Sequence, residues 1–578
     1  MTDKFKSVSI IFLVSALVWS SSLTNEFTGY DDLRLIVENK HVEQGVLHCL
    51  SFFWNTFSGS FNTAWADFPT VIYRPLEQYM IAIGYKLWGT SAWHYHFFFN
   101  YLVHIINSVL VFFIIHKFVP KQRLALIITC LWTVHPLAHE ALNMLTSGAG
   151  FLVAHCFFFV AILIMLYSSN WFAILISAGL FFISYLGSEM AILAAPILAI
   201  LLKGDKQYWS KLSLVSASLV AYLIQRSSII PNNIEFTDLA ERILVLAPQT
   251  FAHQLKQVFY PNNLSIDQQH MMMLGNAFSP IHLVSIIISL TIIVSIIYFY
   301  KRDKQISATI AVACISISLA LNIVPIYTLA RDRYTYIFSL CIITAVILVI
   351  EKYLQTKYKY LLAIPIIILM GNKSWQQNSN WSNGEKLWTH TIANTKDLGA
   401  KQVWRYRLLQ YYNNPGTQSF KADPIIQKQI NQDFNNFIIN NNLHKKETLK
   451  ALDAQRNSVK NKYSYDGNKS IASGIFSQAM LLKKQKEFDR MIALLNLAYY
   501  YHPNHYQNNM QLYVWDKSRS EQVFPQILSA TKKHPILAKS LLDSLLILKD
   551  PRYPELVHEL TSNFKNSHMF KEHLEHAQ

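Results

Sequence analysis

Long apolar runs separated by short polar segments dominate the first two thirds of the chain. Eleven such runs lie at residues 8–23, 97–115, 124–138, 150–168, 171–187, 190–202, 211–229, 281–300, 306–324, 336–350 and 360–371. A helix of about 20 apolar residues is long enough to cross the hydrocarbon core of a bilayer. The pattern therefore predicts an all-α polytopic membrane protein with about 11 transmembrane helices, several of them short.

Basic residues mark four of the short loops between these runs. They are Lys117, Lys121 and Arg123; Lys203, Lys206 and Lys211; Lys301, Arg302 and Lys304; and Lys352, Lys357 and Lys359. If each run crosses once, all four loops share a side with the N-terminus, and their positive charge identifies that side as cytoplasmic. The other side then carries a long first loop at about 24–95, the segment 230–280 and everything after residue 372.

Two further apolar stretches, 72–88 and 243–259, are interrupted by charged residues and prolines. If either one alone crossed the membrane, the basic loops would change sides. We therefore expect both to be amphipathic segments that lie in the outer interface or dip partway into the bilayer.

The pattern divides the chain into a transmembrane domain at 1–372 and a polar region at 373–578. Within the second, residues 477–505 have apolar positions at helical spacing, with Phe488, Ala498 and Pro503 where a tetratricopeptide repeat favours them. A single degenerate unit predicts a soluble α-helical domain. It leaves open whether that domain is a tetratricopeptide-like array or another helical fold.

Composition agrees with a membrane protein, because 52% of the residues are hydrophobic and only 15% are charged. Lys4 and Lys6 precede the first run as in a signal peptide, but without a convincing small-residue cleavage site we expect a retained signal anchor. The five cysteines show no metal-ligand spacing, which favours a packing role for them.

Charge is concentrated in the C-terminal region. The formal net charge is +16, and from residue 372 onward 28 Lys and Arg face 17 Asp and Glu, which gives +11 there. Such a surface fits an acidic acceptor protein, anionic membrane lipid or a glycan, or it is simply a solvated basic domain. Nucleic acid is not expected as a partner on the non-cytoplasmic side.

Two adjacent carboxylates, Asp31 and Asp32, follow directly on the first apolar run. Partial desolvation and a like-charged neighbour raise the pKa of such a group toward the range of a general base. A lone Asp-Asp pair is more often a turn or a helix cap. The Asp-Asp pair alone therefore does not distinguish a general base from a turn or a helix cap.

Further polar side chains lie at the outward ends of the predicted spans. They are His135, His139 and Glu140; Glu189; and Arg331, Asp332, Arg333, Tyr334 and Tyr336. Arginines bind phosphate through paired hydrogen bonds, and a carboxylate can take a proton from an attacking hydroxyl, so a lipid-linked sugar phosphate would use both. The alternatives are a salt bridge at a helix end, histidines in the core, and, less favoured, a metal site at His135 and His139.

The order of these motifs resembles the membrane glycosyltransferases of the GT-C fold, closest to the transmembrane and tetratricopeptide-repeat O-mannosyltransferase group. The resemblance covers roughly residues 24–410. It is carried by Tyr30-Asp31-Asp32 with Asn39; Tyr73-Arg74-Pro75-Leu76; Tyr95-His96, Asn100 and His104; His135-Pro136 with Glu140; Ser188-Glu189; Arg331-Asp332-Arg333-Tyr334-Thr335-Tyr336; and Trp381 with Leu387-Trp388.

The resemblance implies an inverting transfer from a polyprenyl-phosphate-linked sugar to an acceptor hydroxyl, with no metal or other cofactor. Asp31 or Asp32 would be the base, and Arg333, with Arg74 or Arg331, would bind the donor phosphate. Supporting or substrate-binding roles would fall to Tyr30, His135, Glu140, Glu189, Asp332, Tyr334 and Tyr336. The chain reads Ser147-Gly148-Ala149-Gly150 where the family usually has Gly-Arg and an acid, so mannose cannot be assumed as the sugar.

The abundance of Asn, Lys and Ile is typical of a bacterial protein, which predicts an inner-membrane location, a periplasmic C-terminal domain and an undecaprenyl carrier. The first hypothesis is transfer to Ser or Thr of an exported, for example pilin-like, protein that the basic C-terminal domain engages. The second has the same chemistry with an envelope glycan or lipid A as acceptor. The third is a transporter or flippase of lipid-linked sugars, which would show mid-membrane charges and internal repeats.

Overall fold

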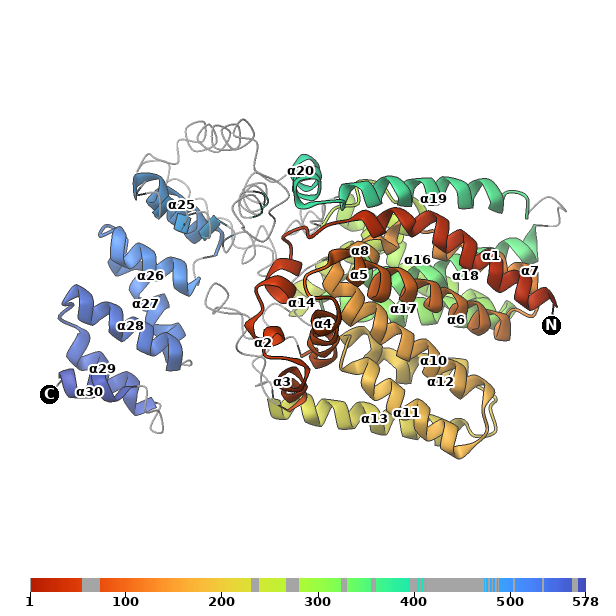
Figure 1. The fold of residues 1–578 in the computed structure, drawn as a ribbon, viewed down its shortest axis with the longest axis horizontal. Helices are drawn as coiled ribbons and strands as arrows, with labels where there is room; N and C mark the ends of the chain where they lie inside the picture. Colours follow the sequence, from red (N-terminus) through yellow and green to blue (C-terminus); the bar gives the residue numbers. More distant parts are fainter. Residues whose placement is uncertain are drawn as a thin grey trace. The chain divides into compact units, whose positions relative to one another are not determined.

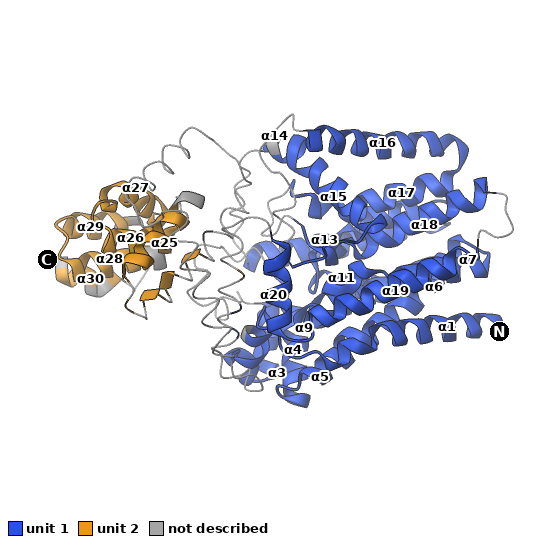
Figure 2. Ribbon diagram, turned by 90° about the horizontal axis from the view of Figure 1, so that it is seen from above, with its two compact units in different colours: residues 1–62, 69–396, 407–421 blue, residues 63–68, 397–406, 422–578 orange. Residues whose placement is uncertain are grey.

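The computed structural model describes residues 2–54, 73–229, 239–266, 280–323, 330–354 and 360–395, most of 472–577, and Trp404, Leu408 and Tyr411. Every regular element of these residues is a helix, as the sequence predicts. The chain forms two compact units, one of residues 1–62, 69–396 and 407–421, and one of 63–68, 397–406 and 422–578 (Figure 2). The predicted boundary at residue 372 therefore lies inside the last long helix of the first unit.

Seven helical segments are long and apolar enough to span a membrane within the described residues. They are Asp3–Thr24, Ala92–Phe118, Leu145–Tyr167, Tyr208–Ile229, Pro280–Arg302, Lys304–Leu321 and Asp332–Tyr353. An eighth span results if the bent pair Gln122–Thr133 and Pro136–Asn143, with 51° between its helices, crosses as one. These apolar helices indicate that the protein is embedded in a membrane through its first unit.

The remaining three predicted runs are also helical but do not meet this criterion. Trp171–Tyr185 (α11) and Glu189–Leu201 are too short, and Ala363–Asn380 (α19) becomes polar in its second half. The total of eleven crossings therefore stays a prediction. The interrupted stretches form α4 (Pro75–Trp88) and α15 (Ala247–Phe259), and neither is among the candidate spans. Their placement in the interface therefore stays a prediction. Residues 55–72 of the long first loop lie outside the described residues.

Basic loops meet at one end of the helices of the first unit. Lys121 at the start of α7 (Gln122–Thr133) forms an ion pair of 2.6 Å with Glu351 near the end of α18 (Tyr336–Tyr353). Lys352 pairs with Asp303 at 2.7 Å, between α16 (Pro280–Arg302) and α17 (Lys304–Ile317). The N-terminal end of α1 (Thr2–Trp19) lies at this same end (Figure 1).

The opposite ends of the same helices are joined by buried indole donors. Trp19 Nε1 at the end of α1 donates to the Thr133 carbonyl at the end of α7, at 2.9 Å. Trp132 Nε1 donates to the carbonyl of Tyr336, the first residue of α18, at 2.8 Å. The polar motifs of the sequence lie just beyond these helix ends, away from the basic loops.

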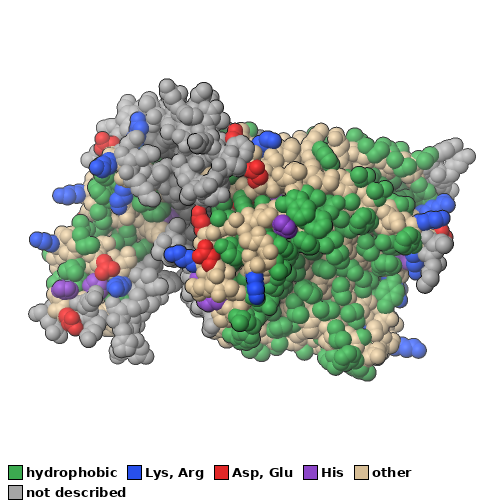
Figure 3. All heavy atoms as spheres, in the orientation of Figure 1, with side chains coloured by type: hydrophobic (Ala, Val, Ile, Leu, Met, Phe, Trp, Pro, Cys, Tyr) green, Lys and Arg blue, Asp and Glu red, His purple; other side chains and the backbone are tan. Residues whose placement is uncertain are grey.

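The core of the first unit is apolar and aromatic between these two ends. It continues into α6 (Leu102–Phe118), α10 (Val153–Tyr167) and α13 (Tyr208–Ile229). Outward-facing apolar side chains are also abundant, and on α16 they include Ile287, Leu290, Ile293, Val294 and Ile297. Hydrophobic side chains cover much of the visible face of this unit (Figure 3), as a lipid-facing surface requires.

Six helices with described bounds lie in the second unit. They are α25 (Phe488–Tyr501), α26 (Tyr506–Trp515), α27 (Ser520–Thr531), α28 (Pro535–Leu548), α29 (Tyr553–Asn563) and α30 (Lys571–Ala577). Each packs mainly on the next, which is the contact pattern of a helical array. Phe488 stacks on Trp515 and Ala498 is buried, whereas Pro503 lies outside the described residues. The tetratricopeptide assignment stays a prediction.

Candidate functional site

Asp32 is a buried helix cap, the alternative that the Asp-Asp sequence left open. Its carboxylate accepts hydrogen bonds from the Thr28 amide (2.6 Å) and hydroxyl (2.9 Å), the Gly29 amide (2.9 Å) and the Leu33 amide (2.8 Å). Burial raises the pKa of Asp32, while these donors act against that rise by favouring the charged form. With four donors on two oxygens, Asp32 shapes the loop and leaves its neighbour Asp31, which is half-buried, as the more accessible carboxylate.

The loop that carries both aspartates is anchored by the residues after α19. Trp388, in α20 (Gly384–Asn394), donates through Nε1 to the Thr28 carbonyl at 2.9 Å. Gly29 has a φ of +73°, where L side chains are strained, and it packs against the Tyr411 ring. These contacts fix the backbone that holds Tyr30 and Asp31.

Tyr30 connects this loop to the arginines at the start of α18. Arg331 donates from Nη2 to the Tyr30 hydroxyl, and its guanidinium lies 5.5 Å from the centre of the Tyr30 ring. Arg331 Nη1 also donates to the Ile266 carbonyl at 2.8 Å. Burial raises the pKa of Tyr30, and the positive charge of Arg331 opposes this rise. Arg331 is therefore held in place by neutral partners on two sides.

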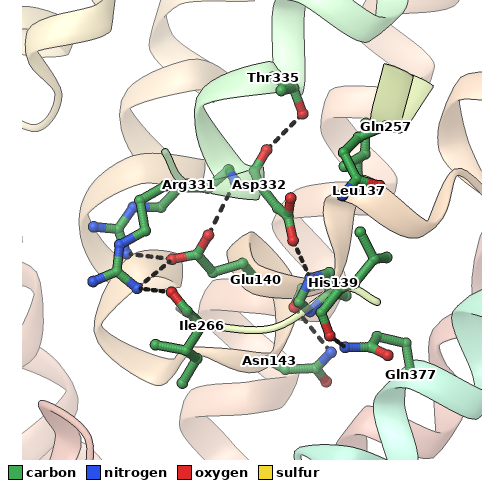
Figure 4. A network of polar contacts seen from close by, with 12 residues as sticks. Leu137, His139, Glu140, Asn143, Gln257, Ile266, Arg331, Asp332, Thr335 and Gln377 are labelled. Atoms are coloured by element: carbon green, nitrogen blue, oxygen red, sulfur yellow. Dashed lines mark hydrogen bonds and ion pairs between the residues drawn. The ribbon is translucent and has the colours of Figure 1, made fainter. Parts of the chain in front are cut away.

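Glu140 is the shared acid of the two arginines, and Figure 4 shows it next to Arg331. Its Oε1 lies 3.3 Å from Nη1 of Arg333 and 3.6 Å from Nη1 of Arg331, and its Oε2 accepts the Arg333 backbone amide at 3.2 Å. Arg333 additionally contacts the Met144 sulfur at 2.9 Å and, unlike Arg331, is only partly buried. Arg333 is thus the arginine of this pair that can more easily reach a ligand.

Three buried side chains, those of Trp381, His139 and Asp332, form a hydrogen-bonded chain next to these arginines. The Trp381 indole donates to Nδ1 of His139 at 2.9 Å, and Nε2 of His139 lies 2.7 Å from Oδ2 of Asp332. An indole N–H can only donate, so Nδ1 must be the acceptor and Nε2 must carry the proton. His139 is therefore the neutral Nε2–H tautomer and donates to the Asp332 carboxylate (Figure 4). This hydrogen bond fixes Asp332, which lies between Arg331 and Arg333 in the sequence.

A second arginine cluster lies at the start of α4. Arg74 Nε and Nη2 contact the same Glu189 oxygen at 2.8 and 2.7 Å, and Arg74 Nη1 lies 3.9 Å from Glu77. The charge of Arg74 is therefore largely matched by Glu189. Glu77 was not among the residues that the sequence singled out, because it appeared only as an interruption of an apolar run.

Electrostatic interactions join these two clusters into one site. The Glu77 carboxyl interacts with the guanidinium groups of Arg74 and Arg333 and with the carboxyl groups of Asp31 and Glu189. The pKa of Glu77 is raised to about 7, because burial and the two acids outweigh the two arginines, which act to lower it. Tyr30 in turn interacts with Asp31 and Arg333. Side chains from four distant parts of the chain thus share one neighbourhood.

Two residues expected in the site have structural positions instead. His135 accepts the Leu137 amide through Nδ1 at 3.2 Å and contacts the Val258 carbonyl through Nε2 at 2.9 Å, so it caps the bend after α7. Tyr336 is buried in the aromatic core, where its hydroxyl contacts Nδ1 of His104 at 2.8 Å. Tyr334 remains beside Arg333, with the guanidinium 5.7 Å from its ring centre.

Within the described residues, no group of three or more His, Cys, Asp or Glu side chains is arranged to hold a metal ion. His135 and His139 in particular have other partners, as described above, so the alternative of a metal on this pair gains no support. What the site offers chemically is a set of carboxylates and guanidinium groups at one end of a helical bundle. A search for matching protein-family models, curated proteins and solved structures finds none for this chain.

Proposed function

We propose that the protein is a membrane glycosyltransferase that transfers a sugar from a polyprenyl-phosphate donor, undecaprenyl phosphate in a bacterial cell, to a hydroxyl group. The observation that carries the proposal is the common neighbourhood of Asp31, Glu77, Arg74 and Arg333 at the end of the bundle opposite the basic loops. A base next to arginines is what glycosyl transfer from a lipid phosphate needs. The sequence resemblance to GT-C glycosyltransferases points to the same chemistry.

The residues divide into clear roles under this proposal. The acceptor oxygen attacks the anomeric carbon of the sugar, the bond from that carbon to the phosphate oxygen breaks, and the acceptor proton passes to the Asp31 carboxylate. Arg333 stabilises the charge on the departing polyprenyl phosphate. Attack from the face opposite the leaving group inverts the anomeric centre.

Asp32 and Arg331 would act indirectly in this reaction. Asp32 is occupied by four hydrogen-bond donors, so it holds the loop of Asp31 and does not compete for the proton. Arg331 is committed to Tyr30 and to the Ile266 carbonyl, so it positions the loop. This assignment chooses between the two aspartates that the sequence left open.

The acceptor we favour is Ser or Thr of an exported protein, on the periplasmic side. The support is the excess of positive charge after residue 372, which would attract an acidic acceptor to the C-terminal unit. Intact masses of exported proteins from strains with and without this protein provide the test. A mass loss in extracted lipopolysaccharide, with exported proteins unchanged, would instead assign an envelope glycan or lipid A as acceptor.

The catalytic roles are tested by comparing Asp31→Asn with Asp32→Asn. Loss of a general base typically costs about 10² to 10⁴ in rate, so Asp31→Asn should keep its folded stability and lose most of its transfer activity. Asp32→Asn should lower the stability, because the new amide group replaces an acceptor that serves four donors. If Asp31→Asn keeps the wild-type turnover, the base assignment is wrong.

A further inference from the structure

Glu77 is a largely buried acid of the site for which the described residues provide no hydrogen-bond donor. The carboxylates of Asp32, Glu140, Glu189 and Asp332 each accept at least one hydrogen bond from the protein. Within the described residues Glu77 accepts none, and its closest charged partner, Nη1 of Arg74, is 3.9 Å away. A carboxyl group that is only 13% exposed normally has partners, so this one is available for a ligand.

The space for Glu77 is created by a glycine on another helix. A Cβ atom at Gly150 would lie 2.9 Å from Oε2 of Glu77 and 3.0 Å from its Cβ and Cγ. Gly150 belongs to the π-helical turn Gly148–Leu152, and any larger residue there would have to displace the acid. The glycine therefore sets where the carboxyl group of Glu77 lies.

Its charged neighbours include the groups proposed to act at both ends of the reaction. Glu77 interacts with Asp31, where the acceptor proton would go, and with Arg333, where the phosphate would bind. In the transfer proposed above, the sugar ring must lie between the attacking hydroxyl and the leaving phosphate. A carboxyl group in that position can donate or accept a hydrogen bond, and sugar hydroxyl groups do both.

We propose that Glu77 binds a hydroxyl group of the donor sugar and that Gly150 provides the space for it. This inference rests on the proposed glycosyltransferase function and extends it to sugar recognition. The chemistry that Glu77 would recognise is a polyhydroxylated ring next to a phosphodiester. A bare lipid phosphate lacks that ring and would not use Glu77.

The test compares binding of two kinds of lipid by the full-length protein in nanodiscs. One is undecaprenyl phosphate alone, and the other is a panel of undecaprenyl-phosphate-linked mannose, glucose, galactose and N-acetylglucosamine. Wild type should prefer at least one sugar-bearing lipid over the bare carrier. Glu77→Ala should weaken that lipid about 10-fold, the equivalent of one lost hydrogen bond of about 1.4 kcal/mol, and change bare undecaprenyl phosphate less than 2-fold.

Two glycine variants provide a matched pair. Gly150→Ala should reproduce part of the loss, because it displaces Glu77 without changing any charge. Gly179→Ala, on α11, should have no effect, because a Cβ atom at Gly179 would meet nothing within 4 Å. Glu77→Gln, which keeps hydrogen-bonding atoms, should lose less affinity than Glu77→Ala.

The outcomes separate the two proposals. Equal weakening of both kinds of lipid by Glu77→Ala, or no weakening of either, overturns the sugar-binding role of Glu77 and leaves the donor site standing. Wild type that binds the bare carrier as well as every sugar-bearing lipid also overturns it. Wild type that binds neither kind, or binding of both that Arg333→Ala does not change, overturns the proposed function itself.

Discussion

The unusual environment of Glu77 predicts a pH-dependent gain of stability in Glu77→Gln. In the folded protein the pKa of Glu77 is about 7, whereas an unperturbed glutamate has 4.5. The folded state therefore keeps the proton over a pH range in which the unfolded chain has lost it. Because the unfolded state binds fewer protons there, stability falls as the pH rises from about 4.5 and levels off above about 7.

The size of the effect follows from the same two values. At 1.36 kcal/mol for each pKa unit, the difference between 4.5 and about 7 corresponds to about 3 kcal/mol. Glutamine has a similar shape and does not titrate, so the variant escapes this penalty. We expect its stability advantage over wild type to grow from under about 1 kcal/mol at pH 5 to about 3 kcal/mol at pH 8.

The assay is unfolding of the detergent-solubilised protein at a series of pH values, with wild type and variant measured side by side. Glu43→Gln serves as the control, because Glu43 is exposed on the short helix Lys40–Glu43 and the same charge is removed there. An advantage of Glu77→Gln that is the same at pH 5 and pH 8 would refute the reasoning. So would a larger advantage at pH 5.

Two further predictions concern contacts beneath the site. Trp381→Phe leaves Nδ1 of His139 buried without its donor, so chemical unfolding should show a loss of about 1–3 kcal/mol, and an unchanged stability would contradict the assigned tautomer. Gly148→Ala places a Cβ atom 1.9 Å from Oδ1 of Asn100, a residue whose Nδ2 donates to two backbone carbonyl groups. We expect this variant to lose about 2–4 kcal/mol in the same assay, whereas the control Gly179→Ala should lose no stability.

The sequence predicted the helical class and the separation of the polar motifs from the basic loops, because hydrophobic periodicity and loop charge are local properties of the chain. It could not choose between Asp31 and Asp32, since the four donors to Asp32 come from the conformation of its own loop. It also could not separate Tyr336, which packs in the core, from Arg333, three residues away in the site. The direction of each side chain at the start of α18 depends on tertiary contacts.

Glu77 is a residue of the site that the sequence did not single out. In the sequence it is one charge in an apolar stretch, and the residue that makes its position possible, Gly150, is a glycine more than 70 residues away. The segment Ser147-Gly148-Ala149-Gly150 lacks the Arg and the acid that the resemblance to the glycosyltransferases leads one to expect there. In the folded chain these two glycines give space to the side chains of Asn100 and Glu77.

The charge balance of the site limits how a donor phosphate could enter. Arg74 is already paired with Glu189, and Arg331 and Arg333 share Glu140. A phosphate must therefore compete with an existing carboxylate for any guanidinium group. Arg333 is the arginine for which this competition is easiest, because it is partly exposed, whereas Arg331 is buried and also donates to the Ile266 carbonyl and the Tyr30 hydroxyl.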